Sequence, residues 1–182
     1  MIFLIMLFYV FFFIRSFFLS KSMGKSIVGE NPIVFLSVFF AGISSLLFLI
    51  YLIFPVIGDY LYIIYFTPLL FLIGTILIIL GLLTSITASL AMKDSWRIGI
   101  NHQEETELIT TGIFQISRNP YFLSFNMVLL GMILCFTSPV LILTVSVTMI
   151  LFHQLILNEE KYLESVHGLE YLNYKKKVRR YL

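Results

Sequence analysis

Arg118-Asn119-Pro120-Tyr121-Phe122-Leu123-Ser124 opens an apolar helix, and this junction between polar and apolar sequence sets the architecture of the chain. A second polar cluster, Asn158-Glu159-Glu160, closes the next apolar helix. The two clusters are separated only by a hairpin whose sequence is apolar enough to lie in a membrane. Because both ends of a two-helix hairpin lie on one side of a membrane, the clusters can form a single site at the membrane surface.

The composition places the chain among integral membrane proteins. Of its 182 residues, 59% are hydrophobic and 12% are charged, and the mean hydropathy is +0.99. A soluble domain has about half apolar and about a quarter charged residues. We therefore expect an all-α membrane protein with a single domain, residues 1–182. The net charge of +2 is too small to indicate nucleic-acid binding, and the one cysteine, Cys135, cannot form an internal disulfide.

Five apolar segments are predicted to cross the membrane as helices, at residues 2–19, 33–54, 61–91, 121–136 and 139–157. A spanning helix needs about 20 residues, so the third segment must tilt or emerge into the headgroups. The last two segments are short and joined by Thr137-Ser138-Pro139, which predicts a tight antiparallel hairpin. Gly81, Ser85 and Ser89 form a stripe of small residues, which lets neighbouring helices approach closely.

Positive charge predicts the orientation of these segments. All 12 Lys and Arg residues lie at the end of the first segment, between the first and second, between the third and fourth, or after the fifth. By the positive-inside rule, the N-terminus is outside and the C-terminus is cytoplasmic. We therefore expect a multi-pass protein of the cell membrane with a site that faces the cytoplasm.

Asn119-Pro120 marks the start of a helix, because Asn favours the N-cap and Pro the first helical position. The N-terminus of a helix attracts carboxylate or phosphate, and Arg118 beside it can pair with an anion through two hydrogen bonds. Taken alone, this motif is explained more simply by a capped helix whose arginine snorkels to the headgroups. Upstream, Thr110-Thr111-Gly112 is typical of a turn.

Ionisable side chains surround the end of the fifth segment. Glu159 and Glu160 point about 100° apart on a helix, so at most one of them faces a given pocket. His153 lies about one turn inside the membrane boundary, where an ionisable residue is a functional candidate unless it only bonds to a neighbouring helix. The sequence has no closely spaced pair of metal-binding residues, so we do not expect a metal site.

The C-terminal region is predicted to be an amphipathic helix that lies on the bilayer or folds over the hairpin. Its basic residues can bind anionic lipid or can serve only to set the topology. The apolar positions with helical spacing are Tyr162, Leu163, Val166, Leu169 and Leu172.

Four motifs follow one another in a fixed order: Thr111-Gly112-Ile113-Phe114, Arg118-Asn119-Pro120, Glu159-Glu160-x-x-Leu163, and Gly168-x-x-Tyr171-x-x-Tyr174-x-x-x-Val178-x-Arg180. In order and spacing they resemble the isoprenylcysteine carboxyl methyltransferase-like family, part of a wider group with the phospholipid methyltransferases. The resemblance covers residues 95–182. The resemblance therefore implies a methyltransferase-like core at residues 93–182 and a three-span N-terminal part at residues 1–92, whose first two spans carry no motif.

Two positions depart from the family pattern. Phe122 stands where the family has a tyrosine, so a hydroxyl is lost. Ser124 stands where the family has a glycine, and its side chain can crowd a close backbone approach. Because of these two departures, the resemblance to the family indicates the cofactor more strongly than it indicates the substrate.

The resemblance implies S-adenosylmethionine bound beneath the hairpin at the cytoplasmic interface. Arg118, Asn119 and Pro120 would shape the pocket, and Glu159 or Glu160 would receive the ammonium or ribose hydroxyls of the cofactor. Arg180 is the candidate to orient an acceptor carboxylate, and a glutamate or His153 would deprotonate an amine acceptor. The full set of expected cofactor-binding positions is Thr111, Gly112, Arg118, Asn119, Pro120, Tyr121, His153, Glu159, Glu160 and Tyr174, and the catalytic candidates are Arg180 and Glu160.

The expected function is methyl transfer to a lipophilic small molecule or lipidated substrate, foremost carboxyl O-methylation of an isoprenylcysteine-like acceptor. N-methylation of a phospholipid or amino-lipid is the first alternative. An NADPH-dependent membrane reductase is a second, since sterol reductases carry a similar Arg-x-Pro-x-Tyr segment. A non-catalytic membrane scaffold is the third.

Overall fold

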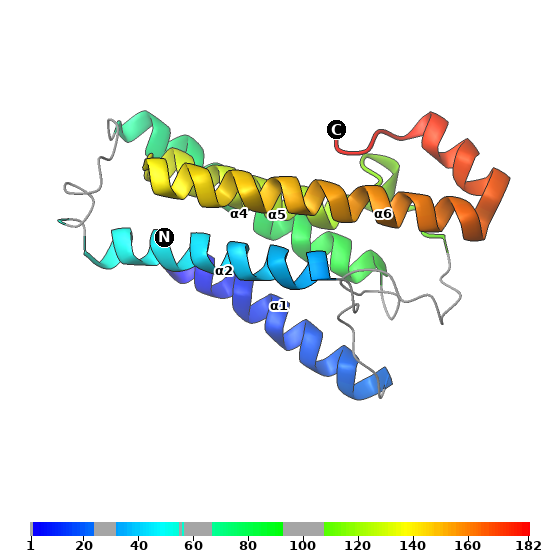
Figure 1. Ribbon diagram of the computed structural model, residues 1–182, viewed down its shortest axis with the longest axis horizontal. Coiled ribbons are helices and arrows are strands. Elements are labelled where there is room, and N and C mark those ends of the chain that lie inside the picture. The colour runs from blue at the N-terminus through cyan, green and yellow to red at the C-terminus, as the bar shows by residue number, and fades with distance from the viewer. Residues whose placement is uncertain (1, 24–31, 55, 57–66, 93–107) are drawn as a thin grey trace.

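The protein is a bundle of long helices, shown as a computed structural model in Figure 1. The structure describes residues 2–23, 32–54, 56, 67–92 and 108–182. Within these residues every regular element is a helix, which confirms the all-α prediction. The elements are α1 (Ile2–Met23), α2 (Pro32–Ile53), α4 (Pro68–Met92), the short 3₁₀ helix η2 (Gly112–Gln115), α5 (Pro120–Cys135) and α6 (Pro139–Lys177).

Proline starts four of these helices. Pro32, Pro68, Pro120 and Pro139 are the first residues of α2, α4, α5 and α6. The fixed φ of proline suits the first helical position, where its missing N–H is not needed. The third apolar segment was expected to begin at residue 61, but α4 begins at Pro68, and residues 61–66 lie outside the described residues.

In the part of the chain that the structure describes, three α-helices are long and apolar enough to cross a membrane, namely α2, α4 and α6. The apolar part of α1 (Phe3–Phe18) and all of α5 are shorter. The 16 residues of α5 rise about 24 Å, which is less than the hydrocarbon thickness of about 30 Å. Each of the five predicted segments therefore contains a helix in its described part, and three of these helices meet the length of a full span.

Gly74 of α4, and Gly81 from the predicted small-residue stripe, let α4 and α5 pack with their backbones close together. A Cβ built on Gly131 of α5 would lie 2.6 Å from the carbonyl oxygen of Gly74 on α4, and the converse distance is also 2.6 Å. A Cβ on Gly81 would lie 2.9 Å from the carbonyl oxygen of Ser124. Glycine on α4 thus provides the room that Ser124, where the family pattern has glycine, would otherwise take away.

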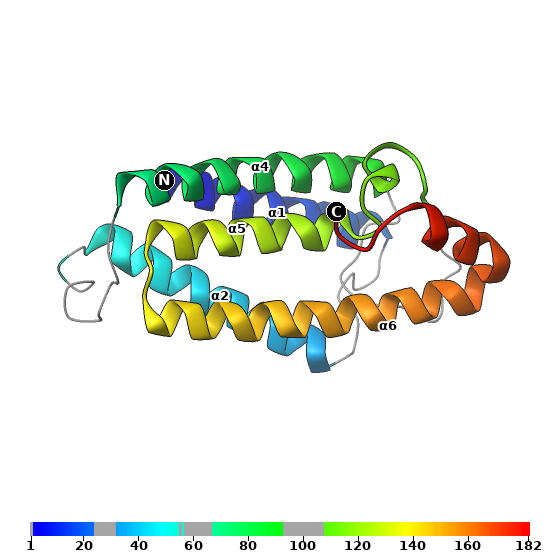
Figure 2. The same ribbon diagram turned by 90° about the horizontal axis from the view of Figure 1, so that it is seen from above.

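α1 and α2 diverge from one another toward the end of the bundle at which the C-terminus lies, as both views show (Figures 1 and 2). α1 is joined to α4 near that end through Arg15, whose Nε donates a hydrogen bond of 3.1 Å to Ser89 Oγ. The small-residue stripe therefore also receives α1. Residues of both helices line a groove, which is described below.

α6 extends far beyond the predicted fifth span and then turns back. Gly168 has φ 51° and ψ −122°, a conformation open to glycine, and there the helix breaks and re-forms in a new direction. The last turns return toward the start of α5 (Figures 1 and 2). They bury Tyr171 and Tyr174, whereas Val166 and Leu169 of the predicted apolar stripe are 42% and 78% exposed. The apolar stripe therefore does not form the packed face of this region.

Candidate functional site

A buried carboxylate lies between two arginines at the end of the hairpin. Glu160 on α6 is 4% exposed. Its Oε1 accepts hydrogen bonds from Arg118 Nη2 at 2.8 Å and Arg118 Nε at 3.2 Å. Arg180 donates to both oxygens of the same carboxylate, from Nη2 to Oε2 at 2.8 Å and from Nε to Oε1 at 3.1 Å. The two polar clusters at the ends of the hairpin thus meet, as the sequence predicted.

The C-terminal strap, residues 178–181, crosses the start of α5 and is fixed there by hydrogen bonds to its main chain. The Arg118 amide donates to the carbonyl of Arg179 at 2.9 Å, and Ser117 Oγ donates to the carbonyl of Arg180 at 3.1 Å. Arg118 Nη1 donates to the carbonyls of Lys175 and Val178. Arg118 therefore holds the strap and the buried carboxylate at the same time.

Asn119 occupies the predicted N-cap position of α5, but its side chain does not cap the helix. Its Nδ2 donates instead to Glu160 Oε1 at 3.3 Å and to the carbonyl of Arg180 at 3.3 Å. The capping role expected for this side chain is thus wrong. The amide joins the charged cluster because a buried carboxylate with a charge-assisted donor set is the stronger acceptor.

The hydrogen-bond partners of Glu160 stabilise its negative charge. Burial by itself raises the pKa of this carboxyl, but the hydrogen bonds from Arg180 and Arg118 outweigh it, so that the pKa lies below its usual range. Glu160 follows the predicted membrane segment 139–157, at the polar end of the hairpin. The carboxylate therefore stays ionised at neutral pH, and both of its oxygens are engaged.

The loop before α5 reaches the cluster through its backbone. Tyr174 Oη donates a hydrogen bond of 2.6 Å to the carbonyl of Phe114 on η2. Burial raises the pKa of Tyr174 to about 12, so that the hydroxyl keeps its proton. Gly112 has φ 61°, which explains the glycine in the turn. Thr111 and Gly112 themselves are exposed on the surface and lie outside the charged cluster.

His153 pairs with the strap rather than with a neighbouring helix. Its Nδ1 lies 2.8 Å from Tyr181 Oη, and the two rings stack with centroids 6.2 Å apart. Tyr181 and Ser117 are site residues that sequence reasoning missed. Both neighbour recognised motif residues, Arg180 and Arg118, and that adjacency is the signal that could have found them. Glu159 is half-buried on the turn that carries Glu160.

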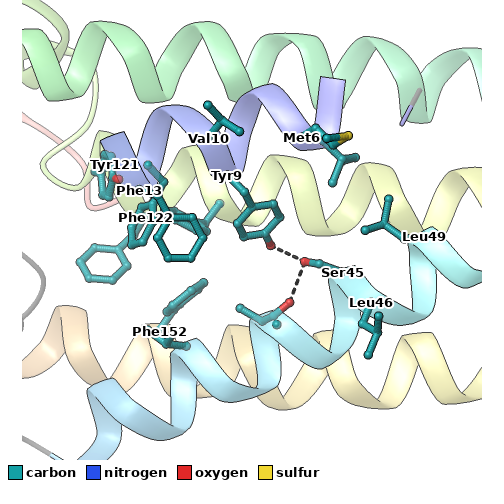
Figure 3. A pocket seen from close by; sticks show the side chains of 16 residues that line it. Met6, Tyr9, Val10, Phe13, Ser45, Leu46, Leu49, Tyr121, Phe122 and Phe152 are labelled. Carbon is teal, nitrogen blue, oxygen red and sulfur yellow. Dashed lines mark hydrogen bonds between the residues drawn. The ribbon is translucent and has the colours of Figure 1, made fainter. Parts of the chain in front are cut away.

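A largely apolar groove of about 460 Å³ lies among the helices (Figure 3). Its walls come from α1 and α2, with Tyr121, Phe122 and Phe125 of α5 and Phe152 of α6 completing it. Figure 3 places Phe13, Tyr121 and Phe122 at one end of the groove and Met6 and Leu49 at the other. The first two helices, which carry no motif, therefore supply most of the lining.

The groove and the charged cluster are joined by consecutive residues. Arg118 and Asn119 bind Glu160, Pro120 starts α5, and Tyr121 and Phe122 line the groove. The Phe122 ring contacts Phe152 with centroids 5.6 Å apart. The phenyl ring that replaces the family tyrosine thus lies in an apolar setting. A polar head and an apolar tail of one ligand can therefore be bound side by side here.

Long apolar helices, a charged cluster at one end of a helical hairpin and an apolar groove define the class as an integral membrane protein. Residues 69–170 match the phospholipid methyltransferase family, which is more than half of the chain. The chain belongs to this family, and the resemblance predicted from its motifs is confirmed.

The chain is also similar to an individual protein of known name. The chain is 32% identical over 109 residues to the protein-S-isoprenylcysteine O-methyltransferase of Saccharomyces cerevisiae. This alignment covers 58% of the chain and 46% of the yeast protein, so that the chain spans about half the length of this relative. No solved structure gives a significant match.

Proposed function

We propose that the chain is an S-adenosylmethionine-dependent membrane methyltransferase that O-methylates the carboxylate of an isoprenylcysteine-like acceptor at the cytoplasmic face. The observation that carries this proposal is the continuity between the charged cluster and the groove through residues 118–122. An acceptor of this kind has a carboxylate head and a hydrocarbon tail, and the two halves of the site match the two parts. Membership of a methyltransferase family supports the transfer chemistry.

The chemistry of the side chains fits the proposed cofactor. A methionine carboxylate requires cations or helix N–H groups, and an ammonium requires carboxylates, and both kinds of partner lie around the start of α5. The Arg118 guanidinium donates four hydrogen bonds to protein atoms and the side chain is 8% exposed, so we assign Arg118 to shaping the pocket. Glu159, which is half-buried beside Glu160, is the carboxylate we assign to the ammonium.

S-adenosylmethionine, when bound, supplies a methyl group on a sulfonium that an acceptor oxygen takes in one displacement, leaving a thioether. The protein has to align the acceptor and exclude water. Arg180 is suited to align it, because its side chain is 31% exposed while its guanidinium is oriented by hydrogen bonds to Glu160. We assign Glu160 to the positioning of Arg180. With a lowered pKa and both oxygens engaged it is poorly placed to accept a proton, and a carboxylate acceptor requires none.

N-methylation of a phospholipid or amino-lipid is the second candidate, and the family to which the chain belongs favours it. An amine acceptor must lose a proton before or during transfer. His153 is the residue for this role, since its imidazole lies near the strap and bonds to Tyr181. The family match favours both methyl-transfer reactions over the reductase and the scaffold alternatives.

The experiment is methyl transfer from labelled S-adenosylmethionine by the purified protein to a prenyl-thioether acid and to an amino-lipid of matched chain. We expect transfer to the acid, with a rate that does not rise steeply between about pH 6 and 8, because the acceptor is already ionised there. Transfer to the amino-lipid alone would overturn the carboxylate assignment and leave the methyltransferase class intact.

Two variants separate a role in alignment from a general charge effect. Arg180→Lys keeps the charge but loses the two-pronged contact with Glu160, so we expect a fall in kcat/KM of about tenfold or more. Arg179→Ala is the matched control, because Arg179 is exposed and adjacent in sequence. Equal rates for the wild type and Arg180→Lys would remove Arg180 from the proposal.

A further inference from the structure

The groove has a closed floor and one open side. Ile5, Ala41 and Phe125 on its floor are 1%, 5% and 8% exposed. Val10 and Leu46 on its rim are 46% and 59% exposed, and they belong to α1 and α2. Because the exposed rim residues come from α1 and α2, which diverge in Figure 1, we place the open side between these two helices, where it would face the lipid in a membrane. A chain can therefore enter the groove sideways.

A hydrogen bond crosses this groove from one wall to the other. Tyr9 Oη on α1 bonds to Ser45 Oγ on α2, and Figure 3 shows the pair between the Phe13–Phe122 end and the Met6–Leu49 end. Apart from Tyr121 at the mouth, these are the polar side chains of the lining. The pair therefore divides an apolar groove into an outer compartment next to the charged cluster and an inner compartment beyond it.

We propose, on the basis of the proposed function, that the Tyr9–Ser45 pair is the stop that sets how much of the acceptor's hydrocarbon chain the site accepts. For a chain to pass, Tyr9 must leave Ser45. Its hydroxyl would then be without a partner among hydrocarbon groups, which offer none in exchange. Ser45 is less affected, because its Oγ also bonds to the carbonyl of Ala41 at 2.7 Å. The outer compartment, from Phe13 to Tyr9, covers about 6 Å of α1, and the inner one, from Tyr9 to Ile5, about as much again.

Gly42 keeps the outer compartment open. It lines the groove one helical turn from Ser45, on the side of Val38, and a Cβ built on it would meet nothing within 4 Å. A larger residue at this position therefore projects into empty space and shortens the outer compartment without disturbing the packing. A larger residue at position 42 should shorten the length of groove open to the chain, and a smaller residue at position 9 should lengthen it.

The test measures kcat/KM for a series of prenyl-thioether acids that differ only by successive isoprene units. We expect Tyr9→Ala to shift the preference toward longer chains and Gly42→Leu toward shorter ones, each changing the ratio between longest and shortest acceptor at least tenfold. Tyr9→Phe keeps the ring and removes only the hydroxyl, and should shift the ratio in the same direction as Tyr9→Ala. Leu143→Phe, at a 64% exposed position outside the groove lining, should leave the profile unchanged.

A second readout does not depend on turnover. An analogue with a diazirine at the end of its chain is crosslinked to the wild type and to Tyr9→Ala, and the labelled residues are mapped by mass spectrometry. We expect label around Tyr9 and Ser45 in the wild type, and around Ile5 and Leu49 in the variant. The same labelling in both proteins, no label on α1 and α2, or unchanged chain preference in all variants would overturn the stop. Correct labelling without transfer to any acceptor would overturn the proposed function and leave the stop in place.

Discussion

Replacing Glu160 with glutamine removes the negative charge that Arg118 and Arg180 share while keeping the shape of the side chain. The carboxylate receives two hydrogen bonds from each arginine and one from Asn119, at 2.8–3.3 Å. The Arg118 side chain is 8% exposed and that of Arg180 31% exposed. In the variant, two guanidinium groups thus remain close together, one of them buried, with a neutral amide between them.

The structure sets the size of the effect. Removing one partner of a buried ion pair costs about 3–5 kcal/mol, because the remaining charge stays desolvated. Arg180 is partly solvated and glutamine still accepts a hydrogen bond, so we take the lower end, about 3 kcal/mol. For a chain of this size each kcal/mol corresponds to about 2–4 °C, so that the midpoint of thermal unfolding should fall by roughly 6–12 °C.

The assay is thermal unfolding of the purified protein in detergent, followed by circular dichroism. Glu164→Gln is the matched control, because Glu164 forms an ion pair with Lys175 at 3.1 Å in which both side chains are well exposed. An exposed pair contributes less than about 1 kcal/mol, so this control should melt within about 4 °C of the wild type. If Glu160→Gln melts no lower than Glu164→Gln, the charged cluster does not hold the strap to the hairpin.

Other consequences follow from the same contacts. Because the pKa of Glu160 is lowered on folding, its contribution is complete above the unfolded value of about 4.3 and disappears as the pH falls through the folded pKa. The difference in melting midpoint between the wild type and Glu160→Gln should therefore be constant from pH 7 to about pH 5 and shrink below that, and a difference that grows on acidification would contradict this. Gly131→Ala should lower the midpoint through overpacking of about 2 kcal/mol, whereas Gly42→Ala, with no atom within 4 Å, should not; equal effects would refute the packing of α4 on α5. In a cysteine-free background, an impermeant thiol reagent should label Val140→Cys from outside and Lys176→Cys only from the cytoplasm, and labelling of both from one side would refute the topology.

The charged cluster was predictable because its parts lie in short motifs at the ends of a hairpin. Arg118, Asn119 and Glu160 needed only the two helices to be antiparallel for the clusters to meet. The position of Arg180 was not predictable from the pattern, because it depends on the reversal of direction at Gly168. The apolar stripe through Leu169 does not pack on the hairpin, and its predicted contact with the bilayer stays a prediction.

The groove lay beyond sequence reasoning for a different reason. In a membrane helix almost every position is apolar, so that hydropathy does not tell a residue that faces lipid from one that lines a cavity. Tyr9 is a single polar residue in an apolar run and Ser45 is one of two adjacent serines in another, and only the tertiary placement of α1 against α2 makes them partners. Gly42 gave no signal of its own, although its role depends on the space around it.

Equilibrium binding of S-adenosylmethionine to the purified protein, measured by calorimetry beside NADPH, tests the central claim most directly. We predict saturable binding of S-adenosylmethionine at one site, no binding of NADPH, and weaker binding to Arg118→Ala by about tenfold or more, since that variant loses the residue that shapes the pocket. Arg179→Ala should bind as the wild type does. Binding of NADPH alone, or of neither molecule to protein that unfolds cooperatively, would contradict the assignment of this chain as a methyltransferase.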